Sequence, residues 1–199
     1  GVIIRAIGAV ALIAAAITGA VLLLFTPTVF SILGYHPIAV EYVLGDIDPA
    51  VLLVFRAEGK AFTPREISHL ADVKMTIGLV RWGFAATLAL LVLLAFFSGK
   101  AFRAICLWAP GVFLGIGATV ILAYFTLGFQ LVGSVFHRVF FPQGNWAFPF
   151  NSLIITLYGT EEMVNGTVFV LSTALLFLLI IAVVVWRANR ALPTGPEIP

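Results

Sequence analysis

Four long apolar runs constrain the fold of this chain more than any other feature of its sequence. They cover residues 6–25, 76–97, 105–128 and 166–186, and a helix of about 20 apolar residues crosses the roughly 30 Å of hydrocarbon in a bilayer. Hydrophobic residues make up 62% of the chain and charged residues only 10%, whereas a soluble domain is about 45–50% apolar and about 25% charged. The sequence therefore predicts an all-α, polytopic membrane protein whose four transmembrane helices form a single domain over residues 1–199.

The positions of the basic residues predict how these helices are oriented. On one side of a four-span arrangement lie Arg5, Lys100, Arg103, Arg187 and Arg190. By the positive-inside rule that side is cytoplasmic, so both termini are expected inside and the two long connections, residues 26–75 and 129–165, outside. All three His and every acidic residue except Glu197 fall in these connections. Any chemistry is therefore expected on the outer face of the membrane.

Charge and cysteine content exclude several classes of protein. The net charge is only +2 and follows the expected topology, which argues against a nucleic-acid partner. Cys106 is the one cysteine of the sequence, so no internal disulfide can form, and quinone-coupled thiol oxidases are excluded.

The first outer connection contains the segment "FTPREISHLADVK" at residues 62–74. Thr63 and Glu66 have the spacing of a capping box, and Pro64 falls at the first helical position, where its missing N–H has no cost. The pattern predicts a helix that starts at Thr63 and continues unbroken into the second span. At 1.5 Å per residue, His69 would lie about 10 Å above the start of that span at Thr76.

On this helix Glu66, His69 and Asp72 are spaced i, i+3 and i+6, so the two carboxylates are expected to flank the imidazole on neighbouring turns. A carboxylate beside a histidine can hold its tautomer and support a general base. An ordinary solvated face with ion pairs is the other open interpretation of this spacing. The histidines and carboxylates are spread over separate segments without a recognisable ligand spacing, so no metal site is predicted.

The second outer connection contains "FHRVFFPQGNWAFPF" at residues 136–150. Aromatic rings of this kind favour the lipid interface, so we expect interfacial helices here, with His137 and Arg138 held in that layer. Arg138 could pair with a lipid phosphate or a substrate carboxylate. The other open interpretation is an aromatic anchor that sets helix tilt, with His137 incidental. Arg81, inside the second span, is either functional or reaches the interface along its own side chain.

Two sequence elements resemble the bacterial lipoprotein intramolecular transacylase (Lit) family. The first element, E-x-x-H-x-x-D-V-K, is formed by Glu66, His69, Asp72, Val73 and Lys74. The second, F-H-x-x-F-F-x-x-G-x-W-x-F, is formed by Phe136, His137, Phe140, Phe141, Gly144, Trp146 and Phe148. They fall on the two outer connections of the predicted four-span topology.

The resemblance implies an enzyme of the bacterial cytoplasmic membrane whose active site faces the outer leaflet. Its substrate would be a diacylated lipoprotein, whose sn-2 acyl chain moves from the S-diacylglyceryl group to the α-amino group of the N-terminal Cys and leaves a lyso-form lipoprotein. The two functional histidines of the family fall on His69 and His137. Further expected contacts with substrate or membrane lipid are Glu66, Asp72, Arg81, Arg138, Trp146, Asn151 and Ser152, with Asn145 as another oxyanion or glyceryl contact; no cofactor is expected.

This chemistry fits the residue types. Aminolysis of an ester needs a neutral amine, and an α-amino group with a pKa near 8 is mostly protonated at pH 7, so a histidine must take its proton. Nucleophile and ester belong to one substrate molecule, which supplies proximity without a covalent intermediate. No G-x-S-x-G elbow is present, and Cys106 is expected at the cytoplasmic end of the third span, so no acyl-enzyme is predicted. The alternative function is a non-enzymatic membrane scaffold or lipid-binding accessory protein.

Overall fold

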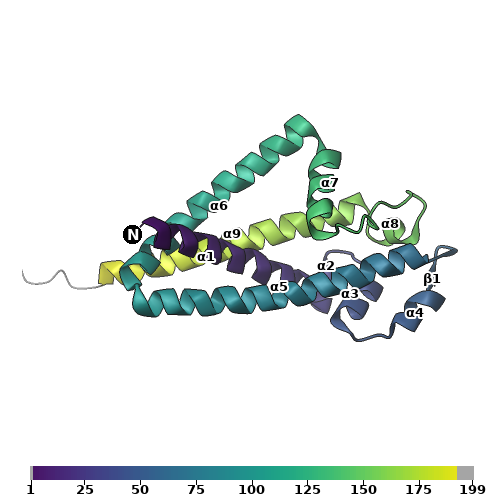
Figure 1. Ribbon diagram of the computed structural model, residues 1–199, viewed down its shortest axis with the longest axis horizontal. Coiled ribbons are helices and arrows are strands. Elements are labelled where there is room, and N and C mark those ends of the chain that lie inside the picture. Colours follow the sequence, from purple (N-terminus) through teal and green to yellow (C-terminus); the bar gives the residue numbers. More distant parts are fainter. Residues whose placement is uncertain (1, 192–199) are drawn as a thin grey trace, which may run out of the picture.

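The computed structural model describes residues 2–191, and four long helices dominate it (Figure 1). They are α1 (Val2–Leu24), α5 (Pro64–Phe97), α6 (Gly99–Leu127) and α9 (Thr160–Ala191). Each is long and apolar enough to cross a membrane. The four predicted spans lie within these helices, except that the first and third extend one residue past the helix end, and each helix starts earlier than its predicted span. The all-α fold is confirmed; the direction of the helices in the membrane stays a prediction.

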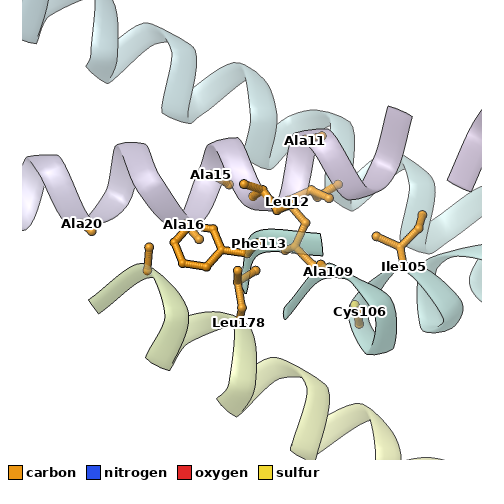
Figure 2. Packing of buried hydrophobic residues seen from close by; sticks show 13 residues of the cluster. Ala11, Leu12, Ala15, Ala16, Ala20, Ile105, Cys106, Ala109, Phe113 and Leu178 are labelled. Atoms are coloured by element: carbon orange, nitrogen blue, oxygen red, sulfur yellow. The ribbon is translucent and has the colours of Figure 1, made fainter. Parts of the chain in front are cut away.

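Helix α1 is the centre of the bundle and contacts α5, α6 and α9. Its buried face is made of small residues, with Ala11, Ala15, Ala16 and Ala20 each at most 6% exposed. Figure 2 shows Ala16 beside the ring of Phe113 of α6, with Leu178 of α9 close by, and all four alanines belong to the same buried cluster as these two residues. Small side chains let helix backbones approach closely, which is how helices associate when lipid offers no hydrophobic driving force.

Helices α2 (Pro27–Ile32), α3 (Pro37–Leu44) and α4 (Pro49–Val54) fill the connection between α1 and α5. Each begins with proline at its first turn, where a missing N–H is tolerated. Strands β1 (Arg56–Ala57) and β2 (Lys60–Ala61) follow as an antiparallel pair. Glu58 and Gly59 join the strands with φ of 50° and 72°, the left-handed conformations that a two-residue hairpin loop requires.

The connection between α6 and α9 contains α7 (Phe129–Phe140) and α8 (Leu153–Leu157). In Figure 1, α6 leans away from α9 and α7 folds back toward the other helices. Gly128 makes this turn with φ of 83°, a conformation that glycine adopts without steric cost. The reversal returns the C-terminal end of α7, which contains His137, to the side of α5.

The two connections pack into one unit, which we call the cap and define as residues 26–63 and 129–159. A second buried cluster joins them, with Tyr42, Leu52 and Phe62 from the first connection and Leu153 and Ile154 from the second. In the same unit the Tyr158 hydroxyl donates to the His36 carbonyl (2.7 Å) and accepts from the Ala39 N–H (3.0 Å). The cap lies at the end of the bundle opposite the N-terminus (Figure 1).

The capping box predicted for α5 is present. The Thr63 side chain accepts from the Glu66 N–H (3.3 Å), and the Glu66 carboxylate accepts from the Thr63 N–H (2.7 Å). Helix α5 then runs without interruption to Phe97, which confirms the continuous helix. It places His69 between the cap and the apolar part of the bundle.

Candidate active site at the junction of cap and bundle

His69 of α5 and His137 of α7 both lie against one aromatic ring, that of Phe141. The Phe141 ring centroid lies 4.8 Å from that of His69 and 5.9 Å from that of His137. Each imidazole also has an aromatic neighbour of its own, since Phe148 lies 5.5 Å from His69 and Trp146 stacks on His137 at 4.8 Å. The structure therefore brings together two histidines that are far apart in the sequence and surrounds them with apolar rings.

The backbone of α7 sets the tautomer of His137. Its Nδ1 lies 2.8 Å from the Gly133 carbonyl oxygen. A carbonyl only accepts hydrogen bonds, so Nδ1 must carry the hydrogen, and in neutral His137 the lone pair is on Nε2. His137 can therefore accept a proton at Nε2.

His69 is more deeply buried, at 9% exposed. Burial lowers the pKa of His69 from its usual 6.5, and the charge of His137 lowers it further, whereas Asp72 and the Asn145 amide raise it. Loss of water disfavours the charged imidazolium more than these two neighbours favour it. His69 is thus held in its neutral form at pH 7.

Asn145 connects Asp72 to this histidine. Its Nδ2 donates to the Asp72 carboxylate (2.5 Å) and to the Ser68 hydroxyl (3.3 Å). With the amide nitrogen held there, Oδ1 points away from Asp72; it is buried without a hydrogen bond among the described residues, as is His69 Nδ1. An N–H on Nδ1 would be the natural donor to this oxygen, and it would leave His69 Nε2 as the basic atom.

Glu66 lies one turn before His69 on α5, as its spacing predicts, but its carboxylate binds other partners. Its carboxylate is 1% exposed; one oxygen accepts from the Thr63 N–H (2.7 Å) and the other from the Ile154 N–H (2.8 Å). Both oxygens are therefore engaged by backbone donors, one from its own helix and one from α8. Glu66 joins the two halves of the cap and is not a hydrogen-bonding neighbour of His69.

The remaining predicted contacts are divided among three places. Asp72 and Trp146 lie at the histidine pair, as described above. Ser152 is the N-cap of α8 and accepts from the Ile155 N–H (3.4 Å), and it lines a neighbouring cavity together with Asn151. Arg138 is exposed on α7, and Arg81 is exposed on α5, about 18 Å along the helix axis from His69. Arg81 is therefore not brought to the pair.

Three features of this site were not predicted from the sequence. Phe141 appeared only as a motif residue, but it is the ring that both histidines share. The Gly133 carbonyl was missed, although a position four residues before a helical histidine is the place to look for such an acceptor. Lys60 and Arg65, at the neighbouring cavity, gave no sequence signal. Within residues 2–191 no three His, Cys, Asp or Glu side chains gather in a way that could hold a metal ion.

Comparison with known proteins identifies the family to which this chain belongs. A family model described as "Lipoprotein intramolecular transacylase Lit" matches residues 49–161, more than half of the chain. A protein of Aquifex aeolicus (strain VF5), described only as "Uncharacterized protein", is 26% identical over 132 residues, which are 59% of this chain and 53% of that protein. The chain thus spans about half the length of this relative, and no solved structure matches. Since the matched range includes both histidines and more than half of the chain, the protein belongs to the lipoprotein intramolecular transacylase (Lit) family.

Proposed function

We propose that this protein is an O-to-N intramolecular transacylase of diacylated lipoproteins in the bacterial cytoplasmic membrane. It moves the sn-2 acyl chain of the S-diacylglyceryl group to the α-amino group of the N-terminal Cys, and the product is a lyso-form lipoprotein. The observation that carries the proposal is that His69 and His137 both contact Phe141, within the part of the chain that matches the family. Two proton-transfer groups in an apolar enclosure suit aminolysis of an ester.

The site would stand at the outer membrane surface. The basic residues that flank the spans lie at the end of the bundle opposite the cap, which by the positive-inside rule turns the cap outward. His69 precedes the apolar part of α5 by about two turns, so the pair would lie at headgroup depth. The ester bonds of a membrane-anchored lipoprotein occupy the same depth.

The number of protons that the substrate amine loses explains why two histidines are needed. The substrate amine begins as an ammonium group and ends as an amide N–H, so it loses two protons; one goes to the departing glyceryl oxygen and the other to water. In the proposed sequence neutral His69 takes the first proton, the free amine attacks the sn-2 carbonyl carbon, and a new N–C bond forms. His137 Nε2 takes the second proton and passes it to the glyceryl oxygen as the C–O bond breaks.

The aromatic walls assist the first step. An ammonium group beside Phe141, Trp146 and Phe148 loses hydration, which disfavours its charged form and eases deprotonation. Because amine and ester belong to one molecule, a site that holds both in place gains the proximity term without an acyl-enzyme.

Mass spectrometry of a lipoprotein tests the reaction. We would express the protein in a host that makes only diacylated lipoproteins and sequence the N-terminal lipopeptide by tandem mass spectrometry, with the empty vector as control. We expect an N-acyl, S-monoacylglyceryl peptide only when the protein is present. An unchanged diacylated peptide at normal protein level would contradict the proposal and favour a non-enzymatic scaffold.

A crossover experiment tests whether the transfer is intramolecular. Two diacylated lipopeptides of different sequence, one with deuterated acyl chains, are mixed with the purified protein in detergent. We expect each peptide to retain its own acyl label. Equal distribution of label over both peptides would indicate transfer between molecules and would contradict the intramolecular mechanism.

The pH dependence of turnover gives a further prediction, for Asp72→Asn. Because the folded pKa of His69 is below 6.5, its neutral form, and hence activity, should persist below pH 6.5 and disappear as the pH falls through that pKa. The Asp72 charge raises this pKa, so its removal should move the acidic limb of kcat/KM to still lower pH. The asparagine oxygen can still accept from Asn145. Asp48→Asn, at the N-cap of α4, is the matched control; an unmoved limb in Asp72→Asn would contradict the role of His69 as base.

A further inference from the structure

A cavity separate from the histidine pair opens beside the first turn of α5. Its volume is about 520 Å³, and its walls include Lys60, Arg65, Phe148, Asn151 and Ser152. This size is within the roughly 300–1,000 Å³ of ligand sites. None of the chemistry proposed above uses it.

The charge of the cavity is positive. Lys60 Nζ donates to the Thr156 hydroxyl (2.7 Å), and Arg65 donates to the Gly144 carbonyl (3.0 Å); both acceptors are neutral. Glu66 also lines the cavity, but it is 1% exposed and both its oxygens accept from backbone N–H groups. The cavity therefore offers two cations and no available carboxylate.

One aromatic ring links this cavity to the candidate active site. The Phe148 ring centroid lies 5.5 Å from that of His69 and 5.8 Å from the Arg65 guanidinium carbon. Asn151 and Ser152, predicted as substrate contacts, line the cavity and not the histidine pair. A substrate held at His69 would therefore have the cavity as its next neighbour.

The position of the cavity relative to the membrane indicates which part of a substrate reaches it. It surrounds the start of α5, about 9 Å beyond His69 along the helix axis and away from the apolar part of the bundle. Acyl chains and the glyceryl group of a lipoprotein lie toward the membrane from its N-terminal Cys. Only the polypeptide continues outward over this distance, whereas a lipid phosphate, attached directly to the glycerol, stays close to the ester bonds.

On this basis we infer that the cavity binds the first residues after the lipidated Cys of the substrate and favours acidic side chains there. The inference rests on the proposed function, because it takes a lipoprotein as the substrate. Lys60 and Arg65 supply the positive charge, and Phe148 separates this peptide site from the acyl-transfer site. The protein would thereby select lipoproteins by the charge of the segment next to their lipid anchor.

Binding is measured with lipopeptides that cannot react. Their glyceryl group carries ether-linked chains, and Cys-Ser is followed by Asp-Asp, Asn-Asn or Lys-Lys. In nanodiscs of neutral lipid, the wild-type protein is expected to bind the acidic peptide about five- to thirtyfold more tightly than the basic one, with the neutral peptide between them, which corresponds to two partly exposed charge pairs. Equal Kd values for the three peptides would overturn the inference.

Charge-reversal variants distinguish a change in peptide recognition from a loss of folding. Lys60→Glu and Arg65→Glu should each weaken the preference, and the double variant should prefer the basic peptide, a gain that a misfolded protein could not produce. Arg56→Glu is the matched control, because Arg56 is exposed on the adjacent strand, bonds to the Leu53 and Phe55 carbonyls, and does not line the cavity. An equal shift of the charge preference in Arg56→Glu would overturn the assignment of Lys60 and Arg65 to the peptide site. A Kd that changes with the content of anionic lipid, and not with the charge of the peptide, would overturn it as well.

Turnover of the ester-linked peptides is measured separately. If the wild-type protein binds with the expected charge preference but rearranges no ester, the proposed reaction fails and the peptide site stands. If it rearranges all three esters and binds the three ether peptides with equal Kd, the reaction stands and the peptide site fails.

Discussion

Replacing His137 by Gln is expected to lower the rate of acyl transfer about 10²- to 10⁴-fold, the range that general acid–base groups contribute. Glutamine keeps a similar size and polarity but has no basic nitrogen, and it removes the Nε2 atom that the Gly133 carbonyl keeps unprotonated. His69→Gln should cause a loss of similar size. The double variant should lose little more than either single variant, because the effects of groups that act as a unit in one reaction are not additive. Single-turnover conversion of a diacylated lipopeptide, followed by mass spectrometry, measures all three rates.

His36 provides the matched control for these substitutions. It is the third histidine of the sequence and the N-cap of α3, where its Nδ1 accepts from the Ile38 N–H (3.3 Å). His36→Asn should keep a good cap and full activity. Retention of at least a tenth of wild-type activity by His137→Gln, or an equal loss in His36→Asn, would contradict the catalytic role.

Removing the Glu66 carboxylate is expected to cause the largest loss of stability. Glu66→Ala leaves the Thr63 and Ile154 N–H groups without their acceptor, and the Ile154 N–H lies in a buried contact. An unsatisfied buried donor costs about 1–3 kcal/mol, so we expect a total of about 2–4 kcal/mol. For a chain of this size that lowers Tm by very roughly 5–15 °C, which a thermal melt in detergent measures.

Two further variants show whether the loss of stability comes from the hydrogen bonds that Glu66 accepts. Glu66→Gln keeps one acceptor oxygen but places an NH₂ group against the other N–H, so its loss should be intermediate. Glu58→Gln, exposed in the hairpin turn, should stay within about 0.5 kcal/mol of wild type. If Glu66 contacted substrate instead, Glu66→Gln would raise KM while Tm stayed unchanged, and our placement of this residue would be wrong.

Local patterns in the sequence were sufficient to predict the four long helices. An apolar run long enough to cross a bilayer has few alternatives to a helix, since each backbone polar group must be satisfied within the segment. The capping box likewise depends only on residues three positions apart, so the start of α5 at Thr63 and its unbroken course followed from Thr63, Pro64 and Glu66 alone. His69 and Asp72 could therefore be placed on adjacent turns of a known helix.

The same periodicity could not show which groups the Glu66 carboxylate binds. Helical spacing says which side chains are neighbours along α5, but it does not say which of them a distant segment will engage. The N–H of Ile154, contributed by α8, donates to this carboxylate, so Glu66 connects α5 to α8.

The sequence by itself determined the four apolar helices, the start of α5 and the residue types available for proton transfer, because each of these depends on short-range geometry and hydrophobicity. Only the tertiary structure decided that α7 folds back, that Phe141 contacts both histidines, that Asn145 joins Asp72 to the site, and that Lys60 and Arg65 meet at one cavity. Those arrangements depend on contacts between segments that are distant in the chain. No local sequence pattern encodes such long-range packing.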